Sequence, residues 1–445
     1  MAADLLTIGL SGTKVARGAL EITGNNIANA STEGYVRRSV VASEVAASSI
    51  AMRPGDISVS GARISAIHRN ADMFRQAEVR RTSSDTARAS AELTGLENIE
   101  SAVEGARVFD LVVDFEAALS ELAADPTDPS LRAEAMSAAG NMAGSFRIAN
   151  DSLDAAATGL QFDASGEVEE VNIMTGELAR INLRIGRTAE GTSERATLLD
   201  ERDGLLEKLS NKVDVQTTFN AIGQVEIRAG GASGELLVQG GDKFALGVTT
   251  AADGTLTFDV AGTAVALSGG SLAGHALGLQ AVADTRSSLN TLASDIMSTV
   301  NTAQGNGAAL DGSGGQPLFS GTGASDMRLA FTDGDGLATA PAGSPAGSTN
   351  TSNLASLRSA FEANGHAQDV SNLVFSISAQ VAGKQVTSEA LNAIAGSARI
   401  ALDQQSGVDL DQEAANLVRY QQAFQASGRV MQVATDIFDT LLGIG

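Results

Sequence analysis

The fold of this chain is decided near its C-terminus, by residues 408–444, which read VDLDQEAANLVRYQQAFQASGRVMQVATDIFDTLLGI. Asp409 is a good helix N-cap, and Asp411 and Glu413 favour the positive end of the helix dipole. Apolar residues recur every seven positions at Leu410, Leu417, Phe424, Met431 and Phe438, with Tyr420 and Leu441 widening the stripe. Since no proline interrupts it, this spacing predicts one long helix with a single apolar face.

The N-terminus carries another stripe with the same kind of spacing. Its members follow one another at steps of three or four residues: Ile8, Gly12, Val15, Ala19, Ile22 and Asn26. Because an isolated helix that exposes an apolar stripe is poorly stable, we expect the two ends to pack on each other or on neighbouring subunits. The pattern alone also fits two ordinary amphipathic helices of a globular core.

Both ends of the chain carry motifs next to these stripes. Residues 24–35 read GNNIANASTEGY, and residues 406–427 contain SGVDLD followed by NLVRYQQAFQAS. The N-terminal motif closely resembles the N-terminal signature of bacterial flagellar rod, hook and hook-associated proteins, and the C-terminal motif resembles their other terminal signature. Residues 198–210, LLDERDGLLEKLS, resemble a segment peculiar to the hook-associated protein 1 family, known as FlgK. The resemblance therefore points to that family.

Composition excludes several other classes of function. Of 445 residues, 30 are basic and 53 acidic, a net charge of −23, and no basic cluster suits a nucleic-acid backbone. Cysteine is absent and the three histidines lie far apart, so we expect neither a disulfide nor a transition-metal site. Nothing at the start resembles a secretory signal, and no apolar run is long enough to span a bilayer. We expect no membrane partner.

The rest of the chain reads as helices interrupted by two β-prone regions. Residues 29–35 predict a turn, and residues 36–66 predict a hairpin around Pro54-Gly55, with Ile57, Val59 and Ile64 as strand residues. Helical spacing follows from about residue 70 to residue 125, and again over 129–153, 171–185 and 198–209. Short β-prone runs with glycine turns fill 213–272. A helix is expected over 279–304, a loop-rich stretch with a hairpin over 327–331, and helices over 353–364, 370–381 and 388–404.

These segments predict a mainly α chain with a β-rich insert, a multidomain α+β fold. It combines paired terminal amphipathic helices in a coiled coil, an elongated helical bundle and a small antiparallel β domain. We expect a terminal domain from residues 1–35 and 405–445. The bundle takes residues 36–212 and 351–404 with a short β segment near 40–66, and the outer insert takes residues 213–350 with its return helix near 279–304.

No stretch predicts a catalytic, cofactor or metal site. Asp333-Gly334-Asp335-Gly336 lacks the glutamate that completes a calcium loop, and Asp311-Gly312-Ser313 lacks the lysine of a phosphate loop, so both read as turns. Carboxylate pairs such as Asp200 with Asp203 are explained as solvated helix faces, although a glycosidase pair stays open. We therefore predict a protein that is not an enzyme.

Polar residues in the terminal motifs are better suited to an interface. Asn25, Asn26 and Asn29 fit hydrogen bonding that sets register between packed helices, and Tyr35 and Tyr420 combine an apolar ring with a polar tip. The expected assembly interface is Ile8, Val15, Ile22, Asn25, Asn26, Asn29, Gly34, Tyr35, Leu410, Leu417, Tyr420, Phe424, Met431, Phe438 and Leu441.

The resemblance implies a structural component of the bacterial flagellum that joins hook to filament by axial self-assembly. Its implied partners are further copies of itself, hook protein, a second junction protein and an export chaperone at the C-terminal helix. Its implied location is extracellular, reached by type III export without a cleaved signal peptide. Two alternatives stay open, namely another axial protein of the hook or rod and a secreted carbohydrate-active enzyme.

Overall fold

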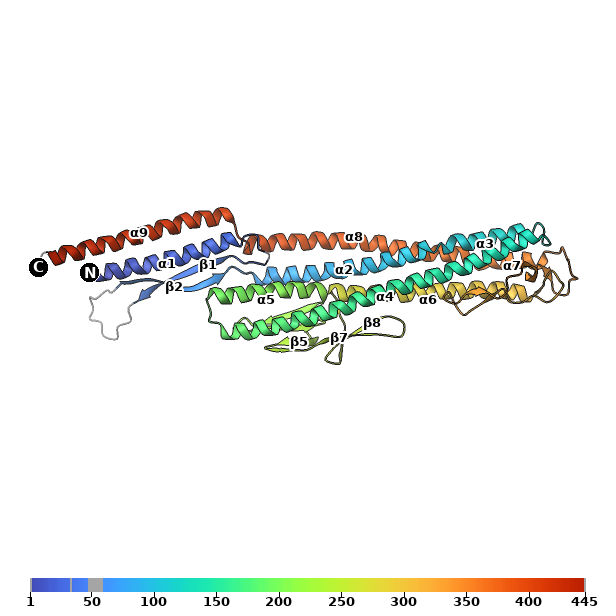
Figure 1. Cartoon of the computed structure of the whole chain (residues 1–445), viewed down its shortest axis with the longest axis horizontal. Helices are drawn as coiled ribbons and strands as arrows, with labels where there is room; N and C mark the ends of the chain where they lie inside the picture. Colours follow the sequence, from blue (N-terminus) through green and yellow to red (C-terminus); the bar gives the residue numbers. More distant parts are fainter. Residues whose placement is uncertain (1, 33, 47–58, 444–445) are drawn as a thin grey trace. The chain divides into compact units, whose positions relative to one another are not determined.

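The computed structural model describes residues 2–32, 34–46 and 59–443 (Figure 1). The chain divides into two compact units. Unit 1 comprises Met1–Ser84, Val171–Ala245 and Asn392–Gly445, and unit 2 comprises Asp85–Glu170 and Leu246–Leu391. Three helices contribute residues to both units: α2 (Met73–Gly105), α4 (Pro129–Arg187) and α8 (His366–Ser406). The three-domain division expected from the sequence stays a prediction.

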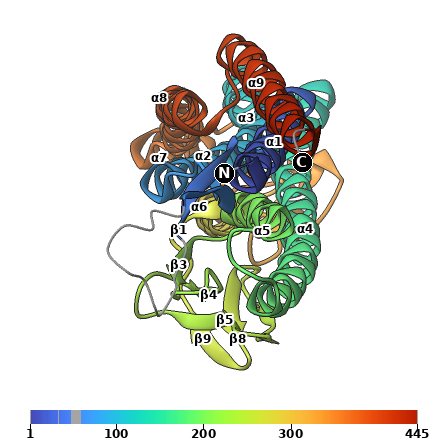
Figure 2. The same ribbon diagram turned by 90° about the vertical axis from the view of Figure 1, so that its left-hand side faces the viewer.

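In unit 1 the two terminal helices pack side by side and antiparallel (Figures 1 and 2). They are α1 (Ala2–Ala28) and α9 (Leu410–Gly443). A side chain at Gly12 would place its Cβ 2.6 Å from Ser427 Oγ, and one at Gly9 would come equally close to Met431 Cγ. Small residues in the α1 stripe therefore let the helices approach closely, and the expected pairing of the chain ends is confirmed.

A β-hairpin packs beside α1 in the same unit. Strands β1 (Arg38–Ala46) and β2 (Val59–Arg69) pair antiparallel, with Arg38 opposite Arg69 and Ala46 opposite Val59. Gly61 has a positive φ of 91°, and a Cβ there would meet Ser11 Oγ of α1 at 2.1 Å. The expected strand residues Val59 and Ile64 are confirmed, whereas Ile57 and the turn at Pro54-Gly55 lie outside the described residues.

The rest of unit 1 places a helix and a small sheet beside the end of α4. Helix α5 (Ser193–Lys212) is capped by Thr192, whose hydroxyl accepts from the amide of Arg195. A four-stranded antiparallel sheet follows in chain order: β3 (Val215–Phe219), β4 (Val225–Ala229), β5 (Glu235–Gln239) and β6 (Asp242–Lys243). The buried carboxamide of Asn182 joins α4 to this sheet, because it bonds both the amide and the carbonyl of Val225.

Unit 2 contains the largest hydrophobic core of the described residues. Its own helices are α3 (Val108–Leu122), α6 (Gly270–Gly305) and α7 (Ser352–Asn364). Phe115 of α3 lies at the centre, with edge-on contacts to Phe319 and Phe361 at ring distances of 6.2 and 5.8 Å. A three-stranded sheet also belongs to this unit: β7 (Leu246–Thr250), β8 (Leu256–Val260) and β9 (Thr263–Val265).

The loop-rich stretch of unit 2 is held by a buried arginine. It contains β10 (Gly307–Ala308), β11 (Phe319–Ser320), β12 (Arg328–Leu329), the 3₁₀ turn η1 (Gly334–Gly336) and β13 (Ala340–Pro341). Arg132 is 1% exposed, and its guanidinium donates to the carbonyls of Gly334 and Leu337 at 3.0 Å. Within this segment the Asp333 carboxylate accepts from the amide of Asp335, which closes the 3₁₀ turn.

Several helix boundaries differ from the expected ones. Residues 129–153 and 171–185 belong to the single helix α4, because Ala157, Leu160, Ala164 and Val168 continue the buried stripe between them. Likewise α8 runs unbroken through the two helices expected at 370–381 and 388–404. Conversely, the helical region before Pro126 is divided at Arg107, which has a left-handed conformation with φ 56°. The mainly helical fold class is confirmed.

Candidate assembly site

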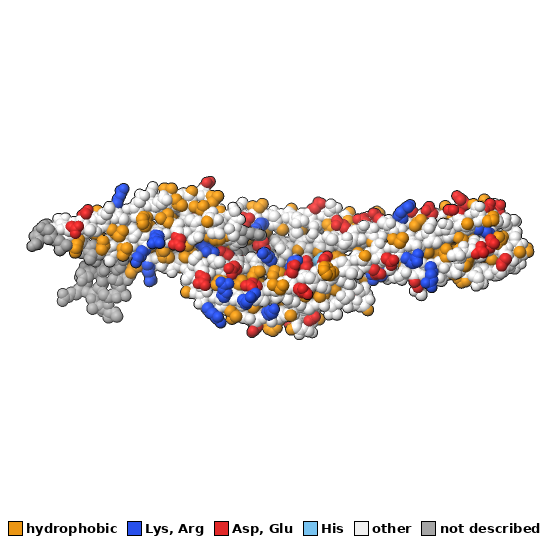
Figure 3. Space-filling view, viewed as in Figure 1, with side chains coloured by type: hydrophobic (Ala, Val, Ile, Leu, Met, Phe, Trp, Pro, Cys, Tyr) orange, Lys and Arg blue, Asp and Glu red, His pale blue; other side chains and the backbone are white. Residues whose placement is uncertain are grey.

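Large apolar side chains stay exposed on the paired terminal helices. Leu410, Phe424 and Phe438 of α9 are 54%, 43% and 55% exposed. Figure 3 shows hydrophobic side chains gathered over α1 and α9. The same helices also expose Leu6, Leu10, Val418, Val430, Val433 and Ile437. This set, with Leu410, Phe424 and Phe438, is called the terminal apolar face below. Several large apolar side chains exposed on one pair of helices make this part of the surface a candidate interface.

The other apolar residues expected at the interface are covered to different degrees. Ile22 is buried, while Ile8, Val15, Leu417, Tyr420 and Met431 are half-buried between the helices and their surroundings. The side chain of Leu441 lies outside the described residues. On α9 the most deeply buried side chains are Glu413 and Ala434, each 1% exposed. The side of α9 that packs on α1 is therefore the side of Glu413 and Ala434, and not the expected side of Leu410, Phe424 and Phe438.

A buried polar cluster, which we call the terminal latch, joins the two helices where α9 begins. It consists of Asn26, Tyr35, Arg37 and Glu413. The carboxamide of Asn26 donates to the Arg38 carbonyl at 2.8 Å and to Glu413 Oε2 at 3.2 Å, and it accepts from the Tyr35 hydroxyl at 2.8 Å. Arg37 Nε donates to Glu413 Oε1 at 2.7 Å. Four polar groups thus set the register of α1, the following turn and α9.

The remaining residues of the N-terminal motif do not enter the latch. Asn25 is exposed, and Asn29 donates to the Asn25 carbonyl at 2.9 Å, which closes the end of α1. Gly34 is exposed and has a positive φ of 76°, as the tight turn before Tyr35 requires. Of the three asparagines, only Asn26 contacts α9. The cap expected at Asp409 is confirmed, since its Oδ1 accepts from the amides of Asp411 and Gln412.

A second buried cluster, here called the arginine cluster, ties the hairpin to α5. Asp200 Oδ2 accepts from Arg38 at 2.7 Å, and Asp200 Oδ1 accepts from Arg69 at 2.6 Å. Because Arg38 and Arg69 are opposite each other in the register of β1 and β2, their guanidinium groups reach one carboxylate from two strands. The ring of Tyr35 lies 5.0 Å from the Arg38 guanidinium, which connects this cluster to the terminal latch.

Asp203, one turn further along α5, completes the arginine cluster. Its carboxylate accepts from Arg69 at 2.7 Å, from Arg202 at 2.6 Å and from Gln76 at 3.0 Å. Burial alone would raise the pKa of Asp203, but the guanidinium groups of Arg202 and Arg69 outweigh it and hold that pKa below its usual value. Burial raises the pKa of Asp200 despite its own arginines.

The expectation that Asp200 and Asp203 lie on a solvated helix face is therefore wrong. The acidic composition suggests solvation, whereas the pair is placed under the hairpin, where arginines from β1 and β2 neutralise it. The sequence pattern assigns Glu413 only a helix-dipole role, and its place in the latch is an addition from the structure. A signal is present, because Glu413, Tyr420, Ser427 and Ala434 form a heptad of their own beside the apolar one.

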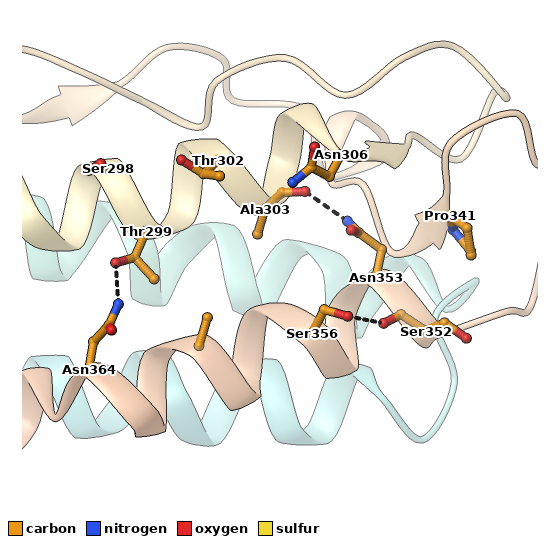
Figure 4. A pocket seen from close by; sticks show the side chains of 11 residues that line it. Ser298, Thr299, Thr302, Ala303, Asn306, Pro341, Ser352, Asn353, Ser356 and Asn364 are labelled. Atoms are coloured by element: carbon orange, nitrogen blue, oxygen red, sulfur yellow. Dashed lines mark hydrogen bonds between the residues drawn. The ribbon is translucent and has the colours of Figure 1, made fainter.

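A groove in unit 2 is a weaker candidate for a functional site. It has a volume of about 700 Å³ and lies between α6 and α7 (Figure 4). Its lining is small and uncharged, and its amides bind protein groups: Asn353 donates to the Ala303 carbonyl and Asn364 to the Thr299 hydroxyl. These two hydrogen bonds join α7 to α6.

Membrane-spanning helices and metal sites are absent from the part of the chain that the structure describes. No described helix is long and apolar enough to cross a membrane. Nor does any group of three or more histidine, aspartate and glutamate side chains among these residues have the arrangement of a metal site.

Comparison with known families bears directly on this geometry. The family model described as "Flagellar hook-associated protein FlgK helical domain" matches residues 93–319, just over half of the chain. This chain belongs to the FlgK family. Two further models match the ends: "Flagella basal body rod protein" over residues 6–35 and "Flagellar basal body rod FlgEFG protein C-terminal" over residues 403–444. Asn26 and Tyr35 of the terminal latch fall in the first of these, and Glu413 falls in the second.

Individual relatives of this FlgK-family chain are distant but extend over most of its length. It is 22% identical to flagellar hook-associated protein 1 of Bacillus subtilis, covering 96% of this chain and 95% of that protein. It is 23% identical to flagellar hook-associated protein 1 of Escherichia coli, covering 99% and 100%. The solved flagellar hook junction protein FlgK of Burkholderia pseudomallei matches with a TM-score of 0.49 and 24% identity, over 54% of this chain and 46% of that one.

Membership of the FlgK family settles the broad role. The chain is a structural protein of the bacterial flagellum, of the hook-associated class.

Proposed function

We propose that this protein joins hook to filament by assembling around the flagellar axis through its terminal helices. The observation that carries the proposal is the terminal apolar face, which stays exposed after α1 and α9 have packed on each other. Leaving so much apolar surface in water is unfavourable by about 25 cal/mol per Å². Contact with neighbouring subunits removes this cost, so assembly and not catalysis is the proposed mechanism.

The terminal latch and the arginine cluster support this mechanism by giving the helices a defined base. Glu413 and Asn26 set the register of the pair, and Asp200 and Asp203 tie the adjoining hairpin to α5. A subunit built this way holds the bases of its two apolar helices in a defined position. Each contact is proposed to be heterologous, with one face of a subunit meeting a different face of the next around the axis.

The partners follow from the same proposal. Hook protein contacts one side of the assembled ring and a second junction protein contacts the other. An export chaperone covers the apolar residues of α9 before secretion, because the same face would otherwise aggregate in the cell. Export proceeds through the flagellar type III route without a cleaved signal peptide, and the assembled protein is extracellular.

The two alternative functions have less support. A hook or rod protein accounts for the terminal matches but not for the FlgK helical-domain match over residues 93–319. A glycosidase needs a carboxylic acid that can give its proton to a substrate in an open cleft. Asp203 is 8% exposed and engaged by two arginines, so it does not suit that role.

The proposal is tested by making the terminal apolar face polar. The triple variant Phe424→Ser, Val433→Ser and Phe438→Ser should fold as a monomer but leave hooks without filaments when it replaces the native protein. Electron microscopy of flagella and swimming assays give the readout, and circular dichroism checks folding. Phe162→Ser is the matched control, because this α4 residue is 77% exposed but lies outside the terminal helices. Normal filaments on hooks carrying the triple variant would contradict the proposal.

A second test addresses the state of the helices before assembly. We expect limited proteolysis of the monomer to remove both ends, before Val36 and after Val408, faster than it cleaves the units. Protection of the same sites is expected in assembled flagella. Equal protection in the monomer would mean that the helices need no partner.

A further inference from the structure

A pocket lies in unit 1 beside the arginine cluster. It has a volume of about 390 Å³. Its walls come from the turn after α1, from α2, α5 and α8, and from the segment that leads into α9. Its charged lining residues are Arg69, Arg80 and Arg399 together with Asp203, Glu207 and Asp403. All of these residues belong to unit 1.

Buried arginines and carboxylates gather next to this pocket. Four arginines are at least nine-tenths buried. Arg38, Arg80 and Arg202 are at most 8% exposed, and the side chain of Arg69 is 9% exposed. Asp200 and Asp203 form ion pairs with three of them, Arg38, Arg69 and Arg202. Nearby, Arg37 binds Glu413, and Arg399 binds Glu207 at 2.5 Å and Asp403 at 3.5 Å.

Arg80 forms no ion pair among the described residues, although the charges of Asp203 and Glu207 act on it. It is 8% exposed, and among the described residues its one protein hydrogen bond runs from Nη2 to Thr217 Oγ1 at 3.3 Å. Arg69 adds a further free donor, because its Nη2 is buried without a partner. Burial lowers the pKa of Arg80, and the charges of Asp203 and Glu207 oppose this shift without reversing it. A buried charge without a partner is costly, so a ligand that supplied the missing charge would bind favourably.

We infer that this pocket is a carboxylate-binding site in which Arg80 is the principal donor. The planar guanidinium matches the two oxygens of a carboxylate in a bidentate pair. The carboxylate has two possible sources, a free organic acid or an acidic side chain of a second copy of this chain. The second source rests on the proposed assembly, and the first does not.

The binding is tested on the full-length monomer with sodium acetate as the probe. Thermal unfolding is recorded while acetate replaces chloride at constant ionic strength. Acetate should raise Tm along a saturating curve, as expected for a ligand that binds only the folded state. Arg80→Gln should abolish the saturating part, whereas Arg81→Gln should retain it. Arg81 is the matched control, because its side chain is 60% exposed and it pairs with Glu78 on the surface.

The acetate experiment can overturn the carboxylate-binding inference. A response that is linear in acetate, or equal in Arg80→Gln and Arg81→Gln, overturns the inference, because general salt effects act on any surface. If Arg80→Gln does not fold, the wild-type curve still decides between saturating and linear behaviour. Titration calorimetry with acetate gives an independent measure, with no binding heat above that of chloride as the contradicting result.

The source of the carboxylate is distinguished by assembly. If a neighbouring subunit supplies it, Arg80→Gln weakens incorporation into flagella and acetate competes with incorporation of the wild-type protein. If a free acid supplies it, acetate binds and incorporation is unchanged by either treatment. If the triple variant of the terminal apolar face assembles normally while acetate still binds at Arg80, the proposed function is wrong but the carboxylate-binding site is supported.

Discussion

Glu413 Oε2 accepts a hydrogen bond from Asn26 Nδ2 at 3.2 Å, although the two residues are 387 positions apart in the sequence. The same carboxylate binds Arg37 through its other oxygen at 2.7 Å, and it is 1% exposed. One side chain therefore joins the first helix, the last helix and the segment leading into the hairpin. A buried polar group at this position fixes the register of the two helices, because an apolar seam alone would allow one helix to slide along the other.

Removal of this carboxylate should loosen the helix pair. Glu413→Ala leaves the carboxamide of Asn26 short of a partner in a buried position, which should lower the free energy of unfolding by about 1–3 kcal/mol. Arg37 is 26% exposed and can turn partly to water, so its share of the loss is smaller. Urea unfolding measures the loss, and proteolysis after Val408 should become faster.

Asp436→Ala is the control for this change, because Asp436 is an exposed acidic residue of the same helix. Its effect should stay within about 0.5 kcal/mol. Equal stability of the two variants would show that the terminal latch contributes nothing to the pairing.

Because α1 and α9 approach closely, a glycine-to-alanine substitution should have opposite effects on stability at two positions of α1. Gly9→Ala places a Cβ 2.6 Å from Met431 Cγ and 3.2 Å from the Ser427 carbonyl, so α9 must shift and the pair is destabilised. Gly24→Ala meets nothing within 4 Å and should stabilise α1 by up to about 1 kcal/mol through helix propensity. Thermal unfolding of both variants tests this, and stabilisation by Gly9→Ala would argue against the observed seam.

Substitutions in the arginine cluster should lower the free energy of unfolding more than most substitutions in unit 1. Asp203→Ala leaves Arg69 and Arg202 buried with one carboxylate fewer, which should cost about 3–5 kcal/mol. The neighbouring Glu201→Ala removes only an exposed pairing with Arg184 at 3.6 Å, worth about 0–1 kcal/mol. Denaturant titration of the two variants should show this contrast. Similar losses for both would mean that α5 is held by packing alone.

Acidification should weaken unit 2 through His366. The ring is 3% exposed, lies edge-on to Phe361 at 4.7 Å and bonds the Thr299 hydroxyl at 3.0 Å. Burial lowers the pKa of His366, although Asp295 and Asp369 oppose this shift. Because the unfolded chain then binds the proton more readily, stability is retained above the ordinary value of 6.5 and declines as the pH falls below it.

The measurement compares the change in Tm between pH 7 and pH 5 for the wild type and His366→Gln. The Tm of the wild type should fall more on acidification than the Tm of His366→Gln. His68→Gln, at an exposed position of β2, should show the same fall in Tm as the wild type. Identical pH profiles for the wild type and His366→Gln would exclude this histidine as a cause.

Predictions from sequence succeeded where the information is local. Asp409 caps α9 as its position before the apolar stripe predicts, and Val59 and Ile64 lie in a strand as their β propensity indicates. Helix ends were less predictable, because the stretch from Ala157 to Val168 buries only four residues, two of them alanines, and so has a weak apolar pattern. The sequence predicts one insert for the β-rich region, and its strands are divided between the two units after Ala245.

By itself the sequence determined the family, the two amphipathic terminal helices and their tendency to pack, because heptad spacing and capping act over a few residues of chain. Only the tertiary structure decided which face of α9 meets α1, that Glu413 is buried against Asn26, and that Asp200 and Asp203 neutralise Arg38 and Arg69. The physical reason is that a charged side chain carries no local sign of its partner. Whether it is solvated or buried in a pair depends on groups brought to it by the fold from more than a hundred residues away.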